Sequence, residues 1–255
     1  MEPASRPDGT PVVVVTGAGS GLGRATAERF ARGGWYCLLV GRTPSKLEAT
    51  AALLDGGPGC SIAALDVADP GAMDEAVRRL VCERGRVDAL VANAGINPVR
   101  ASALETSDEA WRETLRVNLD GVHRSCKAVL PHMIERRHGA IVAVASIAGR
   151  TGMAARGAYG PSKAAVVQYV RNLAVDHGHQ GIRANSVSPG FVVTDLNRAW
   201  LESLPEDALE RLVGRHLLGL GAPENVADAV HFLCSDESSW ITGVDLPVDG
   251  GYLAH

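Results

Sequence analysis

Seven short aliphatic runs divide the chain, and longer segments with helical patterning separate them. In each run the apolar residues occupy consecutive positions, which is typical of parallel strands that are buried on both faces. The alternation continues without a linker, a repeat or a low-complexity block, so it predicts an α/β fold: a doubly wound parallel sheet of about seven strands in a single domain. The runs are Val12–Val15, Tyr36–Val40, Ser61–Leu65, Val87–Val91, Ala140–Ala145, Ile182–Ser188 and Asp245–Val248.

Local signals predict where several helices begin and end. Thr43–Pro44 and Asp69–Pro70 each pair an N-cap residue with a proline in the first helical turn. Thr106–Glu109 has the spacing of a capping box. Gly33–Gly34 is expected to end the first helix, because glycine is the common residue after a helix C-terminus.

One segment interrupts the regular alternation of strands and helices. At about residues 195–221, a mostly helical stretch lies between a strand and the next clear helix. Inserted segments of this kind often form a lid or a substrate loop. We therefore expect a flexible N-terminus over residues 1–10 and a single domain over residues 11–255 that carries this substrate-loop insertion.

Charge and cysteine content restrict the partners and the compartment. The 25 Lys and Arg residues against 29 Asp and Glu give a formal net charge of −4, which argues against nucleic acid because a phosphate backbone requires a basic footprint. The five cysteines have neither CxxC nor metal-ligand spacing, so we expect a reduced, cytoplasmic protein without a metal site. We expect neither a signal peptide nor a membrane span, since no apolar run is long enough.

A cluster of glycines follows the first run. Residues 12–23 lead from a strand through Thr16, Gly17, Gly21 and Gly23 into a helix, and this TGxxxGxG pattern differs from the usual GxGxxG spacing. Glycine permits close approach of the backbone, and a helix N-terminus offers free N–H groups and the positive end of its dipole. The turn therefore suits the pyrophosphate of a dinucleotide in a Rossmann-type sheet, although a glycine cluster alone fits a plain βα turn about as well.

The end of the second run carries the residue that would select the dinucleotide. A carboxylate there would bind the ribose 2′-hydroxyl of NAD, whereas an arginine would accommodate the 2′-phosphate of NADP. The sequence has Gly41 and Arg42 at this place, and a guanidinium binds phosphate in a bidentate manner. NADP is therefore favoured over NAD, with a solvated surface arginine as the plainer alternative.

A tyrosine and a lysine stand one helical turn apart. Tyr159 and Lys163 occupy positions i and i+4 of a predicted long helix, so they share one face. A phenol has a pKa of about 10, and a nearby ammonium and helix dipole both favour its ionised form. The chain has three lysines among its 25 basic residues, which makes a lysine at this place informative. Alone, the pair would more often be an ordinary helical contact.

With further motifs added, the chain resembles the classical short-chain dehydrogenase/reductase family over nearly its whole length. The motifs follow one another in the family's order. One departure is Ala92, where many members have a second asparagine, and we expect it to change local hydrogen bonds more than the chemistry. The matching motifs are Thr16–Gly23, Asp66–Val67, Asn93–Gly95, Asn118, Ser146, Tyr159 with Lys163, Pro189–Gly190 with Thr194, Ile241–Gly243 and Val248–Gly251.

The resemblance implies a role for each matching residue. Tyr159 would be the general acid in reduction and the general base in oxidation, and Lys163 would lower its pKa and bind the nicotinamide ribose. Ser146 would donate a hydrogen bond to the substrate oxygen, and Asn118 would hold a water in a proton relay. The cofactor would bind Gly17, Gly19, Ser20, Gly21, Leu22, Gly23, Arg42, Asp66, Val67, Asn93, Ala94, Gly95, Tyr159, Lys163, Pro189, Gly190, Val192 and Thr194.

The candidate substrate residues flank these reactive groups. The set is mainly apolar, which predicts a hydrophobic ketone or secondary alcohol. Arg156 alone is weak support for an acidic substrate, and Trp200 with the leucines fits helix packing equally well. The candidates are Asn97, Ser146, Ile147, Ala148, Met153, Arg156, Tyr159, Phe191, Leu196, Trp200, Leu201 and Leu204.

Three functions stay open at this level. The favoured one is an NADP-dependent oxidoreductase of carbonyl or alcohol compounds, expected to be a homotetramer or homodimer as the resemblance implies. One subgroup of this first function is the β-ketoacyl thioester reductases, which the resemblance implies would need two arginines for their acidic carrier protein. The sequence has Arg137 at the first of these positions but Gln180 at the second. The second function is a catalytically silent dinucleotide-binding sensor or scaffold, which should lack Tyr159 or Lys163. The third is a lyase or epimerase on the same scaffold.

Overall fold

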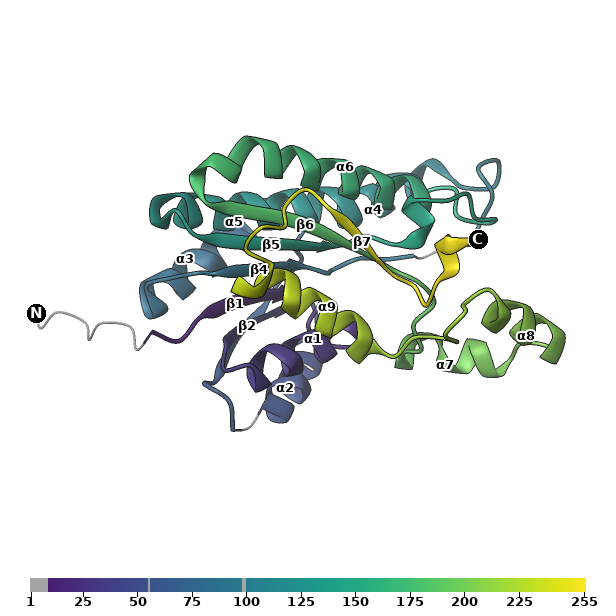
Figure 1. The fold of residues 1–255 in the computed structure, drawn as a ribbon, viewed down its shortest axis with the longest axis horizontal. Coiled ribbons are helices and arrows are strands. Elements are labelled where there is room, and N and C mark those ends of the chain that lie inside the picture. Colours follow the sequence, from purple (N-terminus) through teal and green to yellow (C-terminus); the bar gives the residue numbers. More distant parts are fainter. Residues whose placement is uncertain (1–8, 55, 98–99) are drawn as a thin grey trace, which may run out of the picture.

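The seven predicted strands form one parallel sheet. The computed structural model describes residues 9–54, 56–97 and 100–255, and at residues 195 and 196 it describes the backbone alone. Within these residues the strand order is β3-β2-β1-β4-β5-β6-β7, and every neighbouring pair is parallel. This order confirms the doubly wound, Rossmann-type α/β fold (Figure 1). The strands are β1 (Val12–Thr16), β2 (Tyr36–Gly41), β3 (Cys60–Ala64), β4 (Ala89–Ala92), β5 (Gly139–Val144), β6 (Ile182–Pro189) and β7 (Asp245–Val248).

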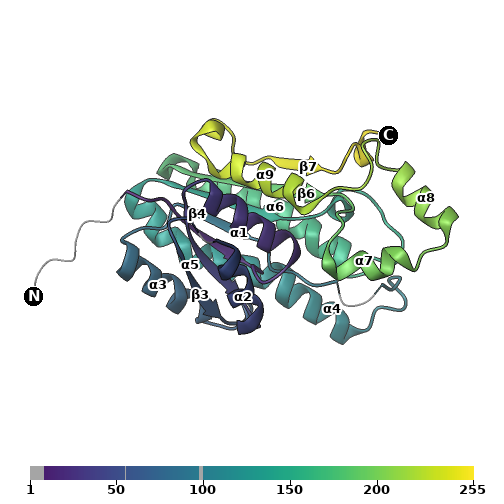
Figure 2. The ribbon, with the colours of Figure 1, turned by 90° about the horizontal axis from the view of Figure 1, so that it is seen from below.

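Helices cover both faces of the sheet (Figure 1 and Figure 2). One layer contains α1 (Gly21–Arg32), α2 (Pro44–Ala51) and α9 (Pro223–Cys234). The other layer contains α3 (Ala72–Arg84), α4 (Asp108–Leu115), α5 (Gly121–Arg136) and α6 (Tyr159–His177). The sheet is therefore enclosed on both sides, which leaves its edges and the ends of its strands for binding.

The strands are continuously apolar because their side chains alternate between two cores. In β1, Val13 and Val15 pack into the core that includes Phe30 of α1. Val12 and Val14 pack into the opposite core, on the face covered by α3, α5 and α6. These four valines are at most 1% exposed, and burying each side chain contributes roughly 1.5–3 kcal/mol.

Two predicted helix starts are wrong by one or two residues. Helix α3 begins at Ala72, because Gly71 occupies the N-cap position with a φ of 78°. Helix α4 is capped by Ser107, whose side chain accepts a hydrogen bond from a backbone amide of the first turn, and not by Thr106. The predicted start of α2 and the predicted end of α1 agree with the structure.

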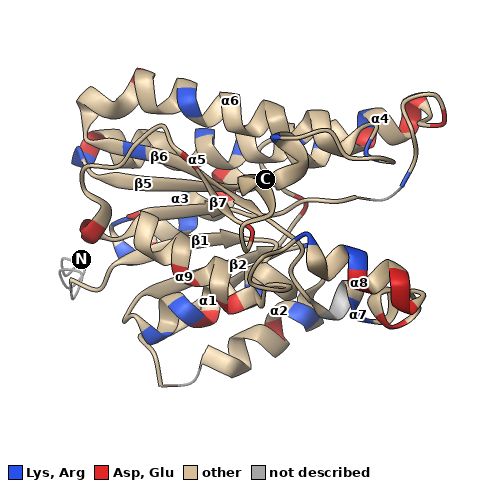
Figure 3. Cartoon of the chain, turned by 45° about the vertical axis from the view of Figure 1, so that its right-hand side comes forward, with Lys and Arg blue, Asp and Glu red and all other residues tan. Residues whose placement is uncertain are grey.

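The interrupting segment forms two helices, α7 (Asp195–Glu202) and α8 (Glu206–Gly214). Both lie beyond the carboxyl ends of the strands, on the same side as the C-terminus (Figure 1). Helix α8 carries acidic and basic residues side by side (Figure 3), including Asp207 and Arg211 at 2.6 Å. Residues 1–8, most of the expected flexible N-terminus, lie outside the described residues. In the described part of the chain, no helix has the length and apolar character to cross a membrane.

Candidate active site

A cavity of about 720 Å³ opens at the carboxyl ends of the strands, beside β1 and β4, and the segments that follow β1 to β6 line it. Doubly wound sheets bind ligands at this edge, where the strand order reverses. Of the predicted residues whose side chains are described, Asn118, Leu201 and Leu204 do not line it. The predicted residues that do are Gly17, Gly19, Ser20, Gly21, Leu22, Gly23, Arg42, Asp66, Val67, Asn93, Ala94, Gly95, Asn97, Ser146, Ile147, Ala148, Met153, Arg156, Tyr159, Lys163, Pro189, Gly190, Phe191, Val192, Thr194 and Trp200.

The glycine-rich turn brings bare backbone to the cavity. Gly17 and Gly21 have φ values of +67° and +50°, a region that glycine adopts readily. A Cβ at Gly23 would overlap the carbonyl oxygen of Gly17, so a side chain there would force the turn open. Because α1 begins at Gly21, the free amide groups of its first turn can bind an anionic group here.

Asn93 fastens the glycine-rich turn to the end of β4. Its side-chain amide donates a hydrogen bond to the carbonyl of Thr16 at 2.9 Å. The Thr16 hydroxyl in turn accepts the backbone amides of Asn93 and Ala94, each at 3.0 Å. These hydrogen bonds form although position 92, which is buried in β4, holds alanine and not a second asparagine. The turn and the loop after β4 therefore form one continuous wall of the cavity.

The far end of the cavity combines basic and acidic groups. Arg42 and Lys46 both line it, Lys46 from the first turn of α2. Asp66 lies opposite, where Arg116 pairs with it at 2.9 Å. Burial raises the pKa of the Asp66 carboxyl, but hydrogen bonds from the Ala68 amide and Arg116, with the charges of Arg116 and Arg42, outweigh it and hold this pKa below its usual value. The ionised carboxylate is therefore already neutralised within the protein.

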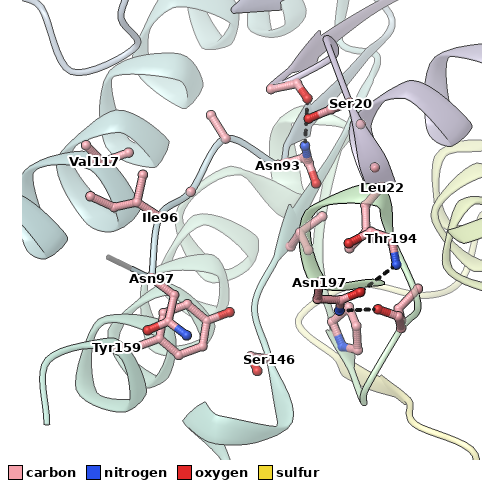
Figure 4. Close-up of a pocket in the computed structure, with 18 of the residues that line it drawn as sticks. Ser20, Leu22, Asn93, Ile96, Asn97, Val117, Ser146, Tyr159, Thr194 and Asn197 are labelled. Carbon is pink, nitrogen blue, oxygen red and sulfur yellow. Dashed lines mark hydrogen bonds between the residues drawn. The ribbon is translucent and has the colours of Figure 1, made fainter. Parts of the chain in front are cut away.

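Tyr159 and Ser146 face the same part of the cavity (Figure 4). The Ser146 hydroxyl oxygen accepts the Ala148 amide at 3.2 Å. Burial raises the pKa of Tyr159, while a hydrogen bond with Ser146 and the positive charge of Arg156 act in the opposite direction, and burial prevails. From the sequence, Lys163 is expected to lower this pKa. In the structure the pKa of Tyr159 is raised, because removing the phenolate from water outweighs the Ser146 hydrogen bond and the positive charge of Arg156.

Lys163 is buried beside the tyrosine. Its ammonium donates a hydrogen bond to the carbonyl of Val144 at 2.8 Å and lies 5.8 Å from the centroid of the Tyr159 ring. Burial lowers the pKa of Lys163 to about 8. A Cβ on Gly95 would lie 3.3 Å from the Lys163 ammonium nitrogen, so glycine at this position leaves that nitrogen accessible from the cavity.

Asn118 lies behind the cavity wall. It belongs to a π-helical turn over Arg116–Asp120, between α4 and α5. Its side-chain oxygen accepts the Ile96 amide at 2.7 Å, and its nitrogen donates to the Ile96 carbonyl at 2.9 Å and to the Ser162 hydroxyl at 3.0 Å. The side chain is thus committed to positioning the loop after β4.

An aromatic stack forms the outer wall. The rings of Phe191 and Trp200 are stacked with centroids 5.7 Å apart, and the Arg100 guanidinium lies 3.8 Å from the centre of the Trp200 ring. His216, which is buried, accepts a hydrogen bond from the Phe191 amide at 3.1 Å. Leu196 was also expected here, but its side chain lies outside the described residues. Helix α7 therefore reaches the cavity through Trp200.

Sequence reasoning missed several lining residues. Asn197 accepts the Thr194 amide and donates to the Val192 carbonyl, both at 2.8 Å (Figure 4), and so closes the first turn of α7. Lys46 and Ile96 were adjacent to predicted motifs, which was the available signal. Arg100 carried no local signal, because its place beside Trp200 depends on a contact across 100 residues of chain.

Known proteins resemble this chain over nearly its full length. A family model described as "Enoyl-(Acyl carrier protein) reductase" matches residues 17–253. Meso-2,3-butanediol dehydrogenase of Serratia marcescens is 38% identical over 244 residues, which cover 95% of this chain and 94% of that protein. 3-Oxoacyl-(acyl-carrier-protein) reductase of Thermotoga maritima is also 38% identical over 244 residues, 95% of this chain and 97% of that protein.

Solved structures agree with this. The structure of ElxO with NADP bound has a TM-score of 0.91 at 30% identity and covers 96% of this chain and 100% of that chain. An NAD+-bound xylitol dehydrogenase has a TM-score of 0.90 at 30% identity, covering 94% and 98% respectively. Fold, motif order and these similarities define a dinucleotide-dependent oxidoreductase. The chain belongs to the short-chain dehydrogenase/reductase family.

Proposed function

We propose that the protein transfers a hydride between NADP(H) and a ketone or secondary alcohol with a largely hydrophobic body. The observation that carries this proposal is that Tyr159 and Ser146 share one cavity with the glycine-rich turn. A dinucleotide bound with its pyrophosphate at that turn would direct its nicotinamide toward the tyrosine. The bare backbone at Gly17 and Gly23 fits such a ligand, as does Gly95, which carries no side chain in front of the Lys163 ammonium.

For this reaction the protein must supply one proton and orient the carbonyl of the substrate. The bound nicotinamide supplies the hydride. Tyr159 would donate its proton to the carbonyl oxygen during reduction and accept it back during oxidation. The Ser146 hydroxyl, whose oxygen accepts the Ala148 amide, would donate its hydrogen to the same substrate oxygen. Lys163 would bind the nicotinamide ribose. The main chain of Asn118 would hold a relay water, because the side chain of Asn118 is bonded to Ile96 and Ser162.

The cofactor preference rests on the end of β2. Arg42 lines the cavity directly after this strand, and Lys46 adds a second cation in the first turn of α2. Two cations at the adenosine ribose suit a 2′-phosphate better than a hydroxyl. Asp66, the nearby acid, is neutralised by Arg116, so it would not repel that phosphate. We therefore propose NADP as the preferred cofactor.

The β-ketoacyl thioester alternative is less well supported by the surface. The Arg137 guanidinium is bonded to the carbonyl of His179 at 2.8 Å, and Gln180 is bonded to His177 at 2.7 Å. Gln180 carries no charge, so Arg137 is the one cation that these two positions offer to an acidic carrier protein. A silent sensor is disfavoured because Tyr159 and Lys163 are both present in the cavity. We also propose a cytoplasmic homotetramer or homodimer, on the cysteine content and the family resemblance.

The test is turnover of NADPH, NADP, NADH and NAD in parallel across a panel of ketones and secondary alcohols. Tyr159→Phe should abolish turnover while NADPH affinity stays within about a few-fold, because the phenol proton is needed for chemistry and not for binding. Tyr169→Phe is the matched control, since this tyrosine is bonded to His123 away from the cavity and should leave turnover unchanged. Full activity of Tyr159→Phe would contradict the assignment.

A further inference from the structure

We propose that the substrate of this site carries an anionic group, a carboxylate, which Arg100 and Arg156 bind beside the reacting carbonyl. This rests on the proposed function and names the class of substrate: a hydroxy acid or keto acid with an apolar body. Both arginines line the substrate end of the cavity. The pair is therefore placed to distinguish an acid from its neutral analogue.

Within residues 9–54, 56–97 and 100–255, neither Arg100 nor Arg156 has a carboxylate counterion. In the part of the chain that the structure describes, the hydrogen bond formed by Arg156 runs from its guanidinium to the carbonyl of Ala155 at 3.2 Å, and Arg100 contacts the ring of Trp200. Other arginines in the described residues do pair with nearby carboxylates, as Arg116 does with Asp66. Two cations that pair with no carboxylate among the described residues are therefore available to a ligand in one cavity.

The fold forces these two cations together. The Gly157 amide donates a hydrogen bond to the carbonyl of Ala101 at 3.0 Å, so the segment before α6 is fastened to the loop after β4. Burial lowers the pKa of Arg100, and the positive charge of Arg156 lowers it further. A bound anion would relieve this repulsion, and a carboxylate matches the fork of a guanidinium geometrically.

The backbone and the aromatic wall strengthen the arrangement. Ala155 has a φ of 56°, a left-handed conformation that is unfavourable for a residue other than glycine. Such strained residues cluster at binding sites, where surrounding structure holds them in place. The stacked rings of Phe191 and Trp200 border the same space, and apolar walls lower the local dielectric and strengthen charge recognition.

Arg156 also sets how far the anionic group lies from the carbonyl that reacts at Tyr159. It precedes Tyr159 by three residues, and its charge acts on the phenol. A carboxylate held there would lie close to the reacting carbonyl. An alternative role for Arg100 is to hold Trp200 and α7 against the cavity, without contact to substrate. That role predicts equal losses for charged and neutral substrates, so the ratio between the two separates the roles.

The first experiment measures kcat/KM for a series of keto acids with increasing spacing between carbonyl and carboxylate, each paired with its primary amide. The wild-type protein should prefer the acid by about tenfold or more at the best spacing, as a charge-assisted hydrogen bond requires. Arg100→Gln and Arg156→Gln should each reduce this acid-to-amide ratio about tenfold. Arg112→Gln, an exposed arginine on α4 paired with Asp108, should leave the ratio unchanged.

The second experiment needs no turnover. Calorimetry with the NADP-loaded wild-type protein should show cyclohexanecarboxylate binding about tenfold more tightly than cyclohexanecarboxamide, with the preference lost in both glutamine variants. Equal binding of the two probes, or a preference for the acid that survives both substitutions, would overturn the anion site. Because binding is measured apart from hydride transfer, a failed reaction assay and a failed anion site give different results.

Discussion

Burial governs Tyr159 and Lys163 more than their contact with each other. It raises the pKa of the phenol and lowers that of Lys163 to about 8, because each charged form loses contact with water. The tyrosine therefore remains protonated at neutral pH, which suits a proton donor in ketone reduction. The i, i+4 spacing correctly predicted that the two side chains would be neighbours, but spacing carries no information about how deeply the fold buries them.

The positive charge of Arg156 opposes the effect of burial on the pKa of Tyr159. Removing it in Arg156→Gln should raise the pKa of Tyr159 further, because the phenolate loses a favourable positive charge. Alcohol oxidation requires the phenolate, so the rising limb of kcat/KM against pH should move to higher pH in this variant. The check is a pH profile of oxidation for a neutral alcohol, with Arg112→Gln as control. An unmoved limb would show that Arg156 does not act on the phenol.

Arg42 should distinguish the two dinucleotides. Arg42→Ala should weaken NADPH binding by about 10- to 100-fold, the value of a charge-assisted contact to phosphate, and barely change NADH binding. Dissociation constants for both cofactors can be measured by fluorescence titration of wild-type and variant protein. Arg78→Ala, an exposed change on α3, controls for net charge. Equal losses for NADPH and NADH would mean that Arg42 does not contact the 2′-phosphate.

At the scale of elements, strands were predicted more closely than helix ends. The seven aliphatic runs identify all described strands of the sheet to within two residues, because burial on both faces leaves a continuous apolar pattern. Helix starts depend on single backbone conformations, such as the left-handed Gly71 before α3. The π-helical turn that turns Asn118 toward Ile96 depends on a contact between separate elements, and local sequence does not encode it.

The glycine-rich turn gives a test of close packing between β1 and α1. Gly23→Ala places a Cβ against the Gly17 carbonyl and the Asn93 side chain, so it should lower the free energy of unfolding by about 1–3 kcal/mol and weaken dinucleotide binding. Gly214→Ala at the end of α8 is the control, since no atom lies within 4 Å of its added Cβ. Urea denaturation measures both. Equal stability of the two variants would contradict the close approach.

The whole molecule brings together residues that lie far apart in the chain. Arg100, Arg156 and Trp200 come from three segments and meet at one cavity. The family motifs could be located in the sequence because they recur in a fixed order. The outer wall of the cavity could not, because it is assembled from loops whose relative positions are set by the completed sheet. Substrate recognition is therefore the part of function that most needed the structure.

The same architecture imposes a stability cost on the molecule. Lys163 is buried with a pKa of about 8 and one hydrogen bond to the Val144 carbonyl, so its charge opposes folding at neutral pH. Lys163→Met should abolish turnover and raise the free energy of unfolding at pH 7 by about 1–2 kcal/mol.

The pH dependence of this gain follows from linkage. In the unfolded chain the lysine has an ordinary pKa of 10.5, so between about pH 8 and 10.5 the unfolded wild-type chain binds more protons than the folded one, and wild-type stability rises. The advantage of Lys163→Met should therefore be complete below pH 8 and shrink toward pH 10. Urea denaturation of both proteins at pH 7 and pH 10, with Lys127→Met on exposed α5 surface as control, measures it. A gain that does not change between these pH values would show that the lysine charge is not its cause.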